Sequence, residues 1–425
     1  MSSNKVKLGE VCRIEKGATG ILKAIPGEYP MVVTSEERKS HNEYQFDDQA
    51  VIIPLVSGTG HGHASLKRIH FQSGKFALGS ILCAVIPKDK KKLSAEYLYR
   101  FLDLNKEIEL VARMKGMANV TLPMKEIAQI EIPLPSLKEQ FKFVESYKKL
   151  EGNSEELSSE LSHQLTLVKK LRQQLLQDAM QGKLVTQDKN DEPTSELLKR
   201  IKAEKAKDKK YKELPTIKTE EIPFAIPNNW MWCRGEIVAN YIDPQPSHRT
   251  PPASKNGIPY IAMSDINKDG SIDFNSARKV GFEILEEHRN RYELCEGDFI
   301  FGKIGTIGKP VKLPKPFDYT LSANVILIQP NRSLINEDYL FYFLSSPAAE
   351  RNLRDNKSTT SYPVFGMGKA RNMPIPLPPL GEQNRIVAAL EVHLQTCDEL
   401  EANIRISKGQ NEQLLQQVLR EALKA

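Results

Sequence analysis

The sequence lacks the signatures of membrane insertion and export. None of its apolar runs approaches the roughly 18 residues that a membrane-spanning helix needs. The start, MSSNKVKLGE, carries charges without an apolar segment after them. We therefore expect a cytoplasmic protein with neither a membrane span nor a secretory signal. The five cysteines are odd in number and show no C-x-x-C spacing, which indicates reduced thiols, no disulfides and no zinc site.

Signatures of catalysis are also missing. GKIGTIGK fails the phosphate-loop spacing at Ile307, and Pro310 follows Lys309 where Ser or Thr is required. The histidines of SGTGHGH have no acidic or cysteine ligand at a matching spacing. The sequence contains no G-x-S-x-G elbow, no Asn- or Asp-Pro-Pro-aromatic methyltransferase loop and no convincing carboxylate pair. It therefore predicts a binding protein, not an enzyme, with no metal or cofactor of its own.

Length and charge narrow what the chain can be. Its 425 residues exceed one ordinary core, which predicts two or three domains. Charged residues make up 27% of the chain, and the formal net charge of +6 permits an anionic partner without requiring one. The local placement of charge must therefore identify the partner.

The most informative feature is an internal repeat. IPLPSLKEQ, at residues 132–140, returns as IPLPPLGEQ 243 positions later, at residues 375–383. Related segments precede the two copies in the same order: YPMVVTSE and PYIAMSD, VSGTGHG and KIGTIGK, EYLYRFL and DYLFYFL. Each copy is followed by a long polar helical pattern. These paired signals indicate a tandem duplication.

Each half is expected to be a mixed domain followed by one long helix. The apolar runs AVIIP, SILCAVIP, DFIF and NVILIQP, bounded by Gly and Pro, predict buried strands. The prolines of IPLP fix φ and remove donors, so this phrase must join a strand to a helix. We therefore expect an α+β fold with domains at 1–134 and 230–377, helices at 135–182 and 378–425, and a partly helical linker at 183–229.

The two helical segments carry a coiled-coil pattern with apolar residues at three- and four-residue steps. The expected stripe is Leu157, Leu161, Leu165, Val168, Leu171, Leu175 and Ala179, then Val387, Leu390, Leu394, Cys397, Leu400, Ile404, Leu415 and Val418. Each stripe is too narrow for a globular core, which predicts two helices packed antiparallel within the chain. Because the repeat offset falls from 243 at the joint to 239 at the helix end, we expect the first helix to be four residues longer.

The order of these parts resembles the specificity subunit of a type I DNA restriction-modification system. The resemblance covers essentially the whole chain and rests on the two IPLP joints, QGKLV and the NDEPTSELLKRI linker. It implies two target-recognition domains, each reading one half of a bipartite site in double-stranded DNA. The two helices would set the gap between the half-sites and dock modification (methyltransferase) subunits, expected to number two.

The resemblance also implies cofactors and a cellular role. S-adenosylmethionine, ATP and magnesium would be bound by the modification subunits and, in systems that cleave, by restriction subunits, not by this chain. The role would be host defence through DNA methylation. Two alternatives remain open: a coiled-coil scaffold with two protein-binding domains, which would bind no duplex at any salt concentration, and the specificity part of another methyltransferase or nuclease system.

Candidate DNA contacts lie in Gly-containing and polar loops, where the backbone can approach phosphate and short side chains can reach base edges. In the first domain they are Ser57, Thr59, His61, His63, Lys67, Arg68, Arg113, Lys115 and Asn119. In the second they are Gln245, Ser247, His248, Arg249, Lys303, Thr306, Lys309, Lys357, Ser358, Thr359 and Thr360. PQPSHRTPP, which contains Arg249, resembles the early loop of family recognition domains. We favour Arg249 and Lys303 as contacts.

Overall fold

A computed structural model describes residues 5–58, 63–117, 119–205, 214–247, 249–356 and 364–424. The chain divides into two compact units. The first unit contains Met1–His163 and Ile404–Ala425, and the second contains Gln164–Asn403. Among the described residues, no helix is both long enough and apolar enough to cross a membrane.

The globular part of the first unit contains two four-stranded sheets. The larger sheet is antiparallel and has the order β2 (Cys12–Lys16), β9 (Leu82–Pro87), β6 (Ala50–Pro54), β7 (His70–Gln72). The smaller has the order β4 (Lys39–His41), β3 (Tyr29–Val32), β8 (Lys75–Leu78), β5 (Phe46–Asp47). In it, β3 and β8 run parallel. Helix α2 (Ala95–Leu104) packs a buried face, including Leu98 and Leu102, into the core of this unit.

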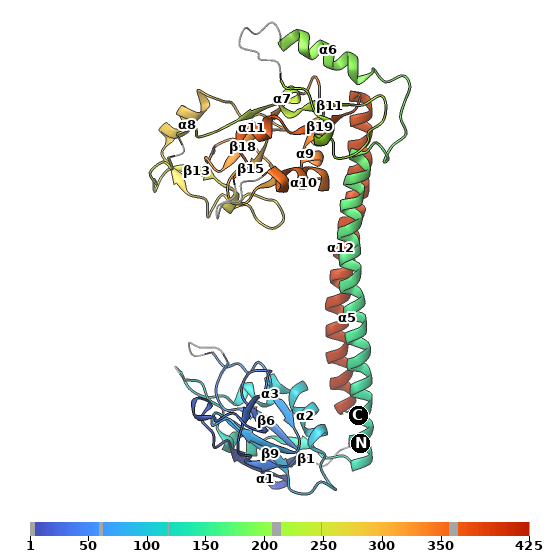
Figure 1. Cartoon of the computed structure of the whole chain (residues 1–425). Helices are drawn as coiled ribbons and strands as arrows, with labels where there is room; N and C mark the ends of the chain where they lie inside the picture. The colour runs from blue at the N-terminus through green and yellow to red at the C-terminus, as the bar shows by residue number, and fades with distance from the viewer. Residues whose placement is uncertain are drawn as a thin grey trace. The chain divides into compact units, whose positions relative to one another are not determined.

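The second unit repeats this arrangement (Figure 1). Its larger sheet has the order β12 (Ala239–Ile242), β18 (Val325–Pro330), β15 (Phe299–Gly302), β16 (Gly308–Lys312) and is again antiparallel. Its smaller sheet has the order β14 (Lys279–Val280), β13 (Ile258–Ile261), β17 (Thr320–Leu321), with β13 and β17 parallel. Pro30 and Pro259 hold the same place, second in β3 and in β13. The duplication predicted from the sequence is therefore confirmed in the fold.

The predicted strands are confirmed as well. AVIIP forms β6, SILCAVIP contains β9, DFIF contributes to β15 and NVILIQP contains β18. Every residue of β6, β9 and β15 is buried. Short apolar runs of this kind are strands covered on both faces.

Shorter elements complete the two units. In the first are β1 (Lys5–Lys7), α1 (Leu8–Val11), η1 (Ile21–Lys23), α3 (Lys106–Glu109), η2 (Val111–Arg113), α4 (Met124–Ala128) and β10 (Glu131–Pro133). In the second are α6 (Thr194–Lys205), η3 (Thr219–Glu221), β11 (Met231–Arg234), α7 (Gly235–Val238), η4 (Met263–Asp265), α8 (Phe282–Arg289), α9 (Glu337–Leu344), α10 (Pro347–Asn356), α11 (Met367–Arg371) and β19 (Pro374–Leu377). The pairs β1–β10 and β11–β19 are antiparallel and lead into the two long helices. The five cysteines all lie in the described part of the chain, and none of them is in a disulfide.

In the first unit, a buried glutamine of the repeated phrase ties the long helix to the globular domain. The amide nitrogen of Gln140 donates to the carbonyls of Lys92 and Pro135, at 2.8 and 2.9 Å. Its amide oxygen accepts the N–H of Ser94 at 2.8 Å. Ser94 is the N-cap of α2, so one side chain fixes the start of the long helix against the start of a core helix.

The second unit contains the same clamp. Gln383 donates to the carbonyls of Leu334 and Pro378, at 3.3 and 2.9 Å, and accepts the N–H of Asn336 at 2.8 Å. Asn336 is the N-cap of α9. Both glutamines are completely buried. The reason for the repeated phrase is therefore structural: each copy joins a globular domain to its helix through buried, fully used amide groups.

The two long helices are α5 (Leu137–Met180), with 44 residues, and α12 (Leu380–Lys424), with 45. The prediction that the first helix is four residues longer is therefore wrong. Gly182, with φ of +68°, ends α5, and the Lys183 N–H donates to the Asp178 carbonyl at 2.9 Å. This is a Schellman motif. The second copy has Glu421, a good helix former, where the first has Gly182, so α12 continues through the aligned turn.

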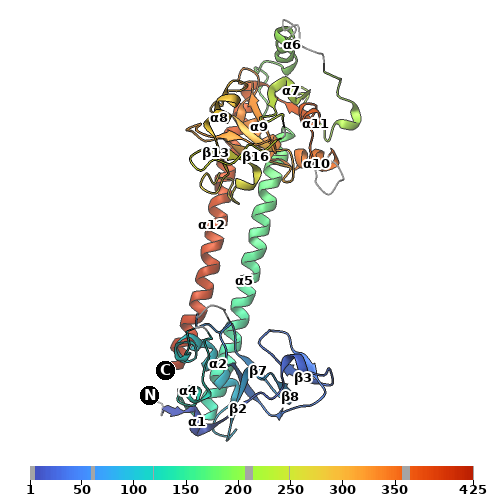
Figure 2. The same ribbon diagram turned by 90° about the vertical axis from the view of Figure 1, so that its left-hand side faces the viewer.

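Within each unit, α5 and α12 pack antiparallel, side by side in both views (Figures 1 and 2). In the first unit, Lys408 donates to the Ser162 hydroxyl at 3.1 Å, and Asn411 donates to the Ser154 carbonyl at 2.9 Å. In the second, Arg172 pairs with Asp398. Residue numbers rise along α5 as they fall along α12, which confirms the antiparallel pair.

The predicted apolar stripe needs correction. Leu157, Leu171 and Leu400 are 47%, 46% and 42% exposed, so they do not belong to the buried seam. The buried positions include Leu161, Val168, Leu176 and Ala179 on α5 and Val387, Leu390, Cys397, Ile404 and Leu419 on α12. A pair of helices buries only the narrow seam between them, and apolar residues beside that seam stay accessible.

We expect Gln383→Leu to lower the free energy of unfolding of the second unit by at least about 3 kcal/mol. Leucine would leave two carbonyls and one N–H without partners in a buried site, and each such group costs roughly 1–3 kcal/mol. Tryptophan fluorescence during urea unfolding measures this unit selectively, because Trp230 and Trp232 are the only tryptophans of the chain.

The matched control is Gln395→Leu, on the exposed surface of the same helix and in the same unit. The control should unfold within about 0.5 kcal/mol of the original protein. Equal unfolding curves for the two variants would contradict a stabilising role for the Gln383 clamp.

Candidate nucleic-acid interface

In the second unit, two candidate segments, the loop after β12 and the segment after β15, meet at one end of the larger sheet, and Val364 and Phe365 lie beside them. The segment after β15 begins at Lys303, whose N–H donates to the Asn324 carbonyl just before β18, at 2.9 Å. The Lys303 carbonyl accepts the N–H of Phe365 at 2.9 Å, and Ile304 forms a β-bridge with Val364. The loop after β12 joins the same end through an ion pair between Lys303 and Asp243.

The first unit gathers its candidates in the same way. The Ser57 N–H, just after β6, donates to the Val120 carbonyl at 2.9 Å, and Val56 forms a β-bridge with Thr121. Thr121 also bridges Lys115. The segment RMKGMANVT therefore lies beside the loop that follows β6, as Val364 lies beside the loop that follows β15. The residues beside the loop after β6 and beside the loop after β15 therefore occupy equivalent places in the two domains.

Three basic candidates of the first unit already have acidic partners. The pairs are Arg68 with Glu36 at 2.7 Å, Arg113 with Glu109 at 3.2 Å, and Lys115 with Glu126 at 2.7 Å. These side chains are partly or largely accessible, and surface pairs of this kind contribute little to stability. Each of these basic side chains could therefore exchange its carboxylate partner for a DNA phosphate at a small cost in stability.

The other described candidates of the first unit are short or exposed. The Ser57 hydroxyl donates to the His63 carbonyl at 2.6 Å and so shapes the loop that follows β6. Lys67 and Asn119 are exposed. Thr59 and His61, together with His248, Lys357, Ser358, Thr359 and Thr360 of the second unit, lie outside the described residues.

In the second unit, the structure separates accessible candidates from buried ones. Lys303 is only 5% exposed, and its ammonium lies 2.6 Å from the Asp243 carboxylate. Gln245 is also buried. The accessible candidates are Ser247, Arg249, Thr306 and Lys309. DNA contact by Lys303 stays a prediction, but its position indicates that it links two loops instead of offering a free charge.

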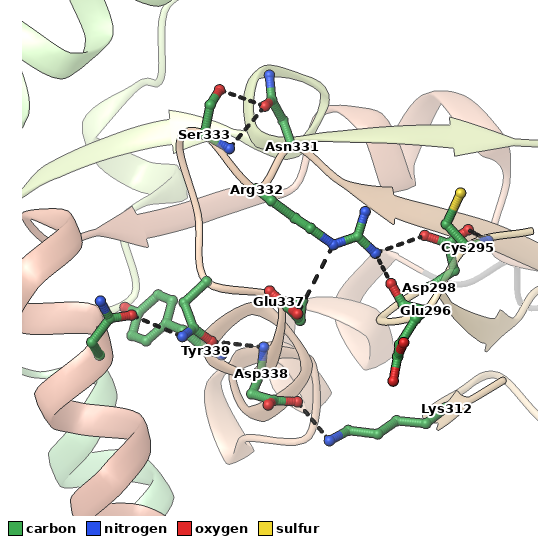
Figure 3. Close-up of polar contacts among 12 residues, drawn as sticks. Cys295, Glu296, Asp298, Lys312, Asn331, Arg332, Ser333, Glu337, Asp338 and Tyr339 are labelled. Atoms are coloured by element: carbon green, nitrogen blue, oxygen red, sulfur yellow. Dashed lines mark hydrogen bonds and ion pairs between the residues drawn. The ribbon is translucent and has the colours of Figure 1, made fainter. Parts of the chain in front are cut away.

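A polar network that sequence reasoning missed lies at the opposite end of the same sheet (Figure 3). The buried Asp298 carboxylate accepts hydrogen bonds from the Cys295 N–H at 2.9 Å and the Gln329 amide at 2.6 Å. Burial raises the pKa of Asp298. Arg332 reaches Asp298 at 3.5 Å, donates to the Glu296 carbonyl and lies 3.9 Å from Glu337 on α9.

This network connects the start of β15 and the end of β18 to α9, the helix whose N-cap bonds with Gln383. Its groups bond to one another and to the backbone, which suits a stabilising role. Within the ranges that the structure describes, no three His, Cys, Asp or Glu side chains are grouped so that they could hold a metal ion.

The comparisons with known proteins identify the family. The model of the type I restriction modification DNA specificity domain matches residues 2–167 and 243–407, which is more than half of the chain. The chain belongs to this family. The resemblance stated from the sequence is thereby confirmed. The first match contains both sheets of the first unit, and the second contains the smaller sheet of the second unit and all strands of its larger sheet except β12.

Relatives and solved structures agree with this assignment. The type I restriction enzyme EcoDI specificity subunit of Escherichia coli is 26% identical over 426 residues, covering 99% of this chain and 87% of that protein. The EcoAI specificity subunit of Escherichia coli is 33% identical over 268 residues, covering 59% of this chain. The matches span less than half of the EcoAI and EcoEI subunits, 44% and 43% of their lengths.

The solved structures support the fold. The HsdS subunit from Thermoanaerobacter tengcongensis is 19% identical, with a TM-score of 0.53 over 99% of this chain and 96% of that one. A chain from a structural study of complex assembly and conformational transition in the type I R-M system is 18% identical, with a TM-score of 0.56 over 100% and 98%. The predicted α+β fold with two similar domains and two long helices is confirmed.

We expect Asp243→Asn to lower the stability of the second unit by about 3 kcal/mol, because it leaves the buried Lys303 ammonium without a counter-charge. Adding Lys303→Met should recover most of that loss, since no unpaired charge then remains. The measurement is urea unfolding followed by tryptophan fluorescence. Asp318→Asn, at an exposed position of the same unit, is the control. A double variant no more stable than Asp243→Asn would contradict this interpretation of the pair.

Proposed function

We propose that this chain is the DNA-recognition subunit of a type I restriction-modification complex, without catalytic activity of its own. The observation that supports the proposal is that the two domains share one arrangement of strands but differ in their loops. Both domains have the same order of strands in the larger sheet and the same glutamine clamp. Two domains with the same fold but different loops are suited to bind two different DNA sequences, the two halves of a bipartite site.

The long helices would set the distance between the two half-sites. A helix of about 45 residues extends roughly 65–70 Å at ~1.5 Å per residue. In the chain, α5 follows the first domain and α12 follows the second, and a spacer of defined length would select half-sites at a defined spacing. We therefore propose that the gap in the target depends on the lengths of α5 and α12.

We further propose that two modification subunits dock on the helices, one for each half of the duplication. Leu167, Leu171 and Val392 of the second unit are 46%, 46% and 64% exposed on the sides of the helix pair. Ile406 and Leu414 of the first unit are 57% and 60% exposed. Apolar side chains in this number on a helix pair are typical of a protein interface.

The cofactors belong to these partners in the proposed assembly. S-adenosylmethionine would be held by the modification subunits, and ATP with magnesium by restriction subunits where the system cleaves DNA. The complex would act in the cytoplasm, where its DNA target is accessible.

The decisive experiment maps modified adenines across the genome of a host that expresses this chain with its neighbouring methyltransferase. The comparison host expresses the methyltransferase alone. A bipartite motif that appears only with this chain is the expected result, and it gives both half-sites and the gap. An assembled complex that produces no new motif would overturn the proposal and favour the scaffold alternative.

We expect Arg249→Ala to weaken binding of the assembled complex to its cognate duplex about 10- to 100-fold, because a well-placed arginine–base contact is worth roughly 1–3 kcal/mol. The control is Arg200→Ala, which removes the same charge from the exposed face of α6. Fluorescence anisotropy with labelled duplexes measures both. If Arg249→Ala binds cognate and mismatched duplexes as the original protein does, Arg249 is not a contact.

We expect Leu171→Glu to reduce capture of the modification subunit at least about tenfold, because a buried, unpaired carboxylate is costly in an apolar interface. The free chain should unfold normally, since Leu171 is exposed in it. Gln173→Glu adds the same charge at a neighbouring exposed position of α5 and should assemble normally. Co-purification from the same cells compares the two. Equal capture would place the docking surface elsewhere.

A further inference from the structure

A buried histidine connects the core of the second unit to the loop after β12. His288, near the end of α8, is 1% exposed. Its Nδ1 bonds with the hydroxyl of Thr320 on β17 and lies 3.1 Å from the hydroxyl of Tyr292. Its Nε2 bonds with the amide oxygen of Gln245. His288 therefore has a core partner on one ring nitrogen and a loop partner on the other.

The direction of the hydrogen bonds follows from Gln245. Its amide nitrogen donates to the Ser247 hydroxyl at 2.8 Å and to the Arg249 carbonyl at 3.3 Å. The amide oxygen faces His288 and can only accept, so Nε2 of the histidine carries the proton. Burial lowers the pKa of His288, which favours the neutral ring. In the neutral ring, Nδ1 accepts from the Thr320 or Tyr292 hydroxyl.

The charged groups nearest this histidine do not change that conclusion. Arg291 lowers the pKa of His288 further, and Glu287 raises it by less than the burial lowers it. The partners from the other packed elements, Gln245, Thr320 and Tyr292, are all uncharged at neutral pH.

The hydrogen bonds from Thr320 through His288 and Gln245 to Ser247 form a relay. This relay ends on the exposed part of the loop after β12. Gln245 is buried, whereas Ser247 and Arg249 are accessible. The amide of Gln245 thus holds the conformation of the residues that can reach a partner, while it remains out of reach itself. Asp243, two residues earlier, is fixed by Lys303 at 2.6 Å. The loop is therefore attached to the core at two positions by polar groups.

The first unit holds the corresponding loop differently. After β2, the Ala18 N–H donates to the amide oxygen of Gln45, whose nitrogen donates to the Lys16 carbonyl, both at 2.9 Å. Gln45 therefore bonds to the backbone at the end of β2 and just after it. The two domains therefore shape the equivalent loop with different side chains.

We propose that His288 is a positioning residue for base recognition by the second domain: through Gln245, it fixes the loop that presents Ser247 and Arg249 to DNA. The inference rests on the proposed function. Without the relay, the loop would sample several conformations, and its contacts would distinguish correct from incorrect bases less well. The first domain would be unaffected, because its loop has its own anchor.

The test measures discrimination along the whole target. The assembled complex is titrated with duplexes that carry the mapped motif or a single base-pair change at each position of either half-site. Four chains are compared: the original, His288→Leu, His288→Gln and Gln245→Ala. His288→Leu and Gln245→Ala should reduce the ratio of cognate to mismatched affinity at least about tenfold in one half-site only. Both should leave the ratio in the other half-site unchanged.

The glutamine variant separates positioning from packing. Its amide can donate to Gln245 and accept from Thr320, so His288→Gln should restore most of the discrimination that His288→Leu loses. Gln245→Ala cuts the relay near the surface and keeps the experiment decisive if His288→Leu does not fold. Full discrimination by Gln245→Ala in both half-sites would overturn the inference, as would an equal loss in both. An original complex that discriminates at no position would instead refute the proposed function.

Discussion

Each long helix of this protein starts from a buried glutamine whose amide is fully used. Gln140 and Gln383 each bond two carbonyls and one N–H, and these groups include the cap of a core helix. A buried amide group without partners is costly, so neither the helix start nor the neighbouring loop can move independently. The direction in which each helix leaves its domain therefore depends on three hydrogen bonds of one side chain.

In the second unit, the two ends of the larger sheet carry different kinds of polar groups. In the second unit, the sheet end close to α9 contains the Asp298 and Arg332 network, whose groups bond among themselves. The opposite end contains loops with accessible polar side chains, among them Arg249 and Lys309. A network of mutually bonded polar groups and a set of accessible polar loops thus lie at opposite ends of the same strands. Loops can then change without loss of the frame, as expected of binding sites on a rigid scaffold.

Much of this architecture could be predicted from local sequence. Proline-bounded apolar runs identify strands such as β6 and β18 because strand burial depends on a few adjacent residues. The duplication was visible because its phrase includes Gln140 and Gln383, which serve the same purpose twice. Helix length was not predictable from offsets, because a single residue, Gly182, decides where α5 ends.

Which candidate contact residues are accessible was harder to predict, for a physical reason. Whether a lysine offers its charge or buries it depends on partners far along the chain. Lys303 is neutralised by a carboxylate 60 positions earlier. Gln245 is held by a histidine 43 positions later. Such pairings follow from the packing of α8 and β15 against the loop after β12, and no local pattern records them.

The two glutamine clamps, Gln140 and Gln383, bond only to backbone groups. The groups bound by Gln140 and Gln383 are main-chain carbonyls, which every residue supplies, and N–H groups, which every residue other than proline supplies. A domain of different sequence would therefore fit the same helix if its chain followed the same path at the joint. The junction can therefore serve as a common attachment point at which domains of different sequence join the same kind of helix.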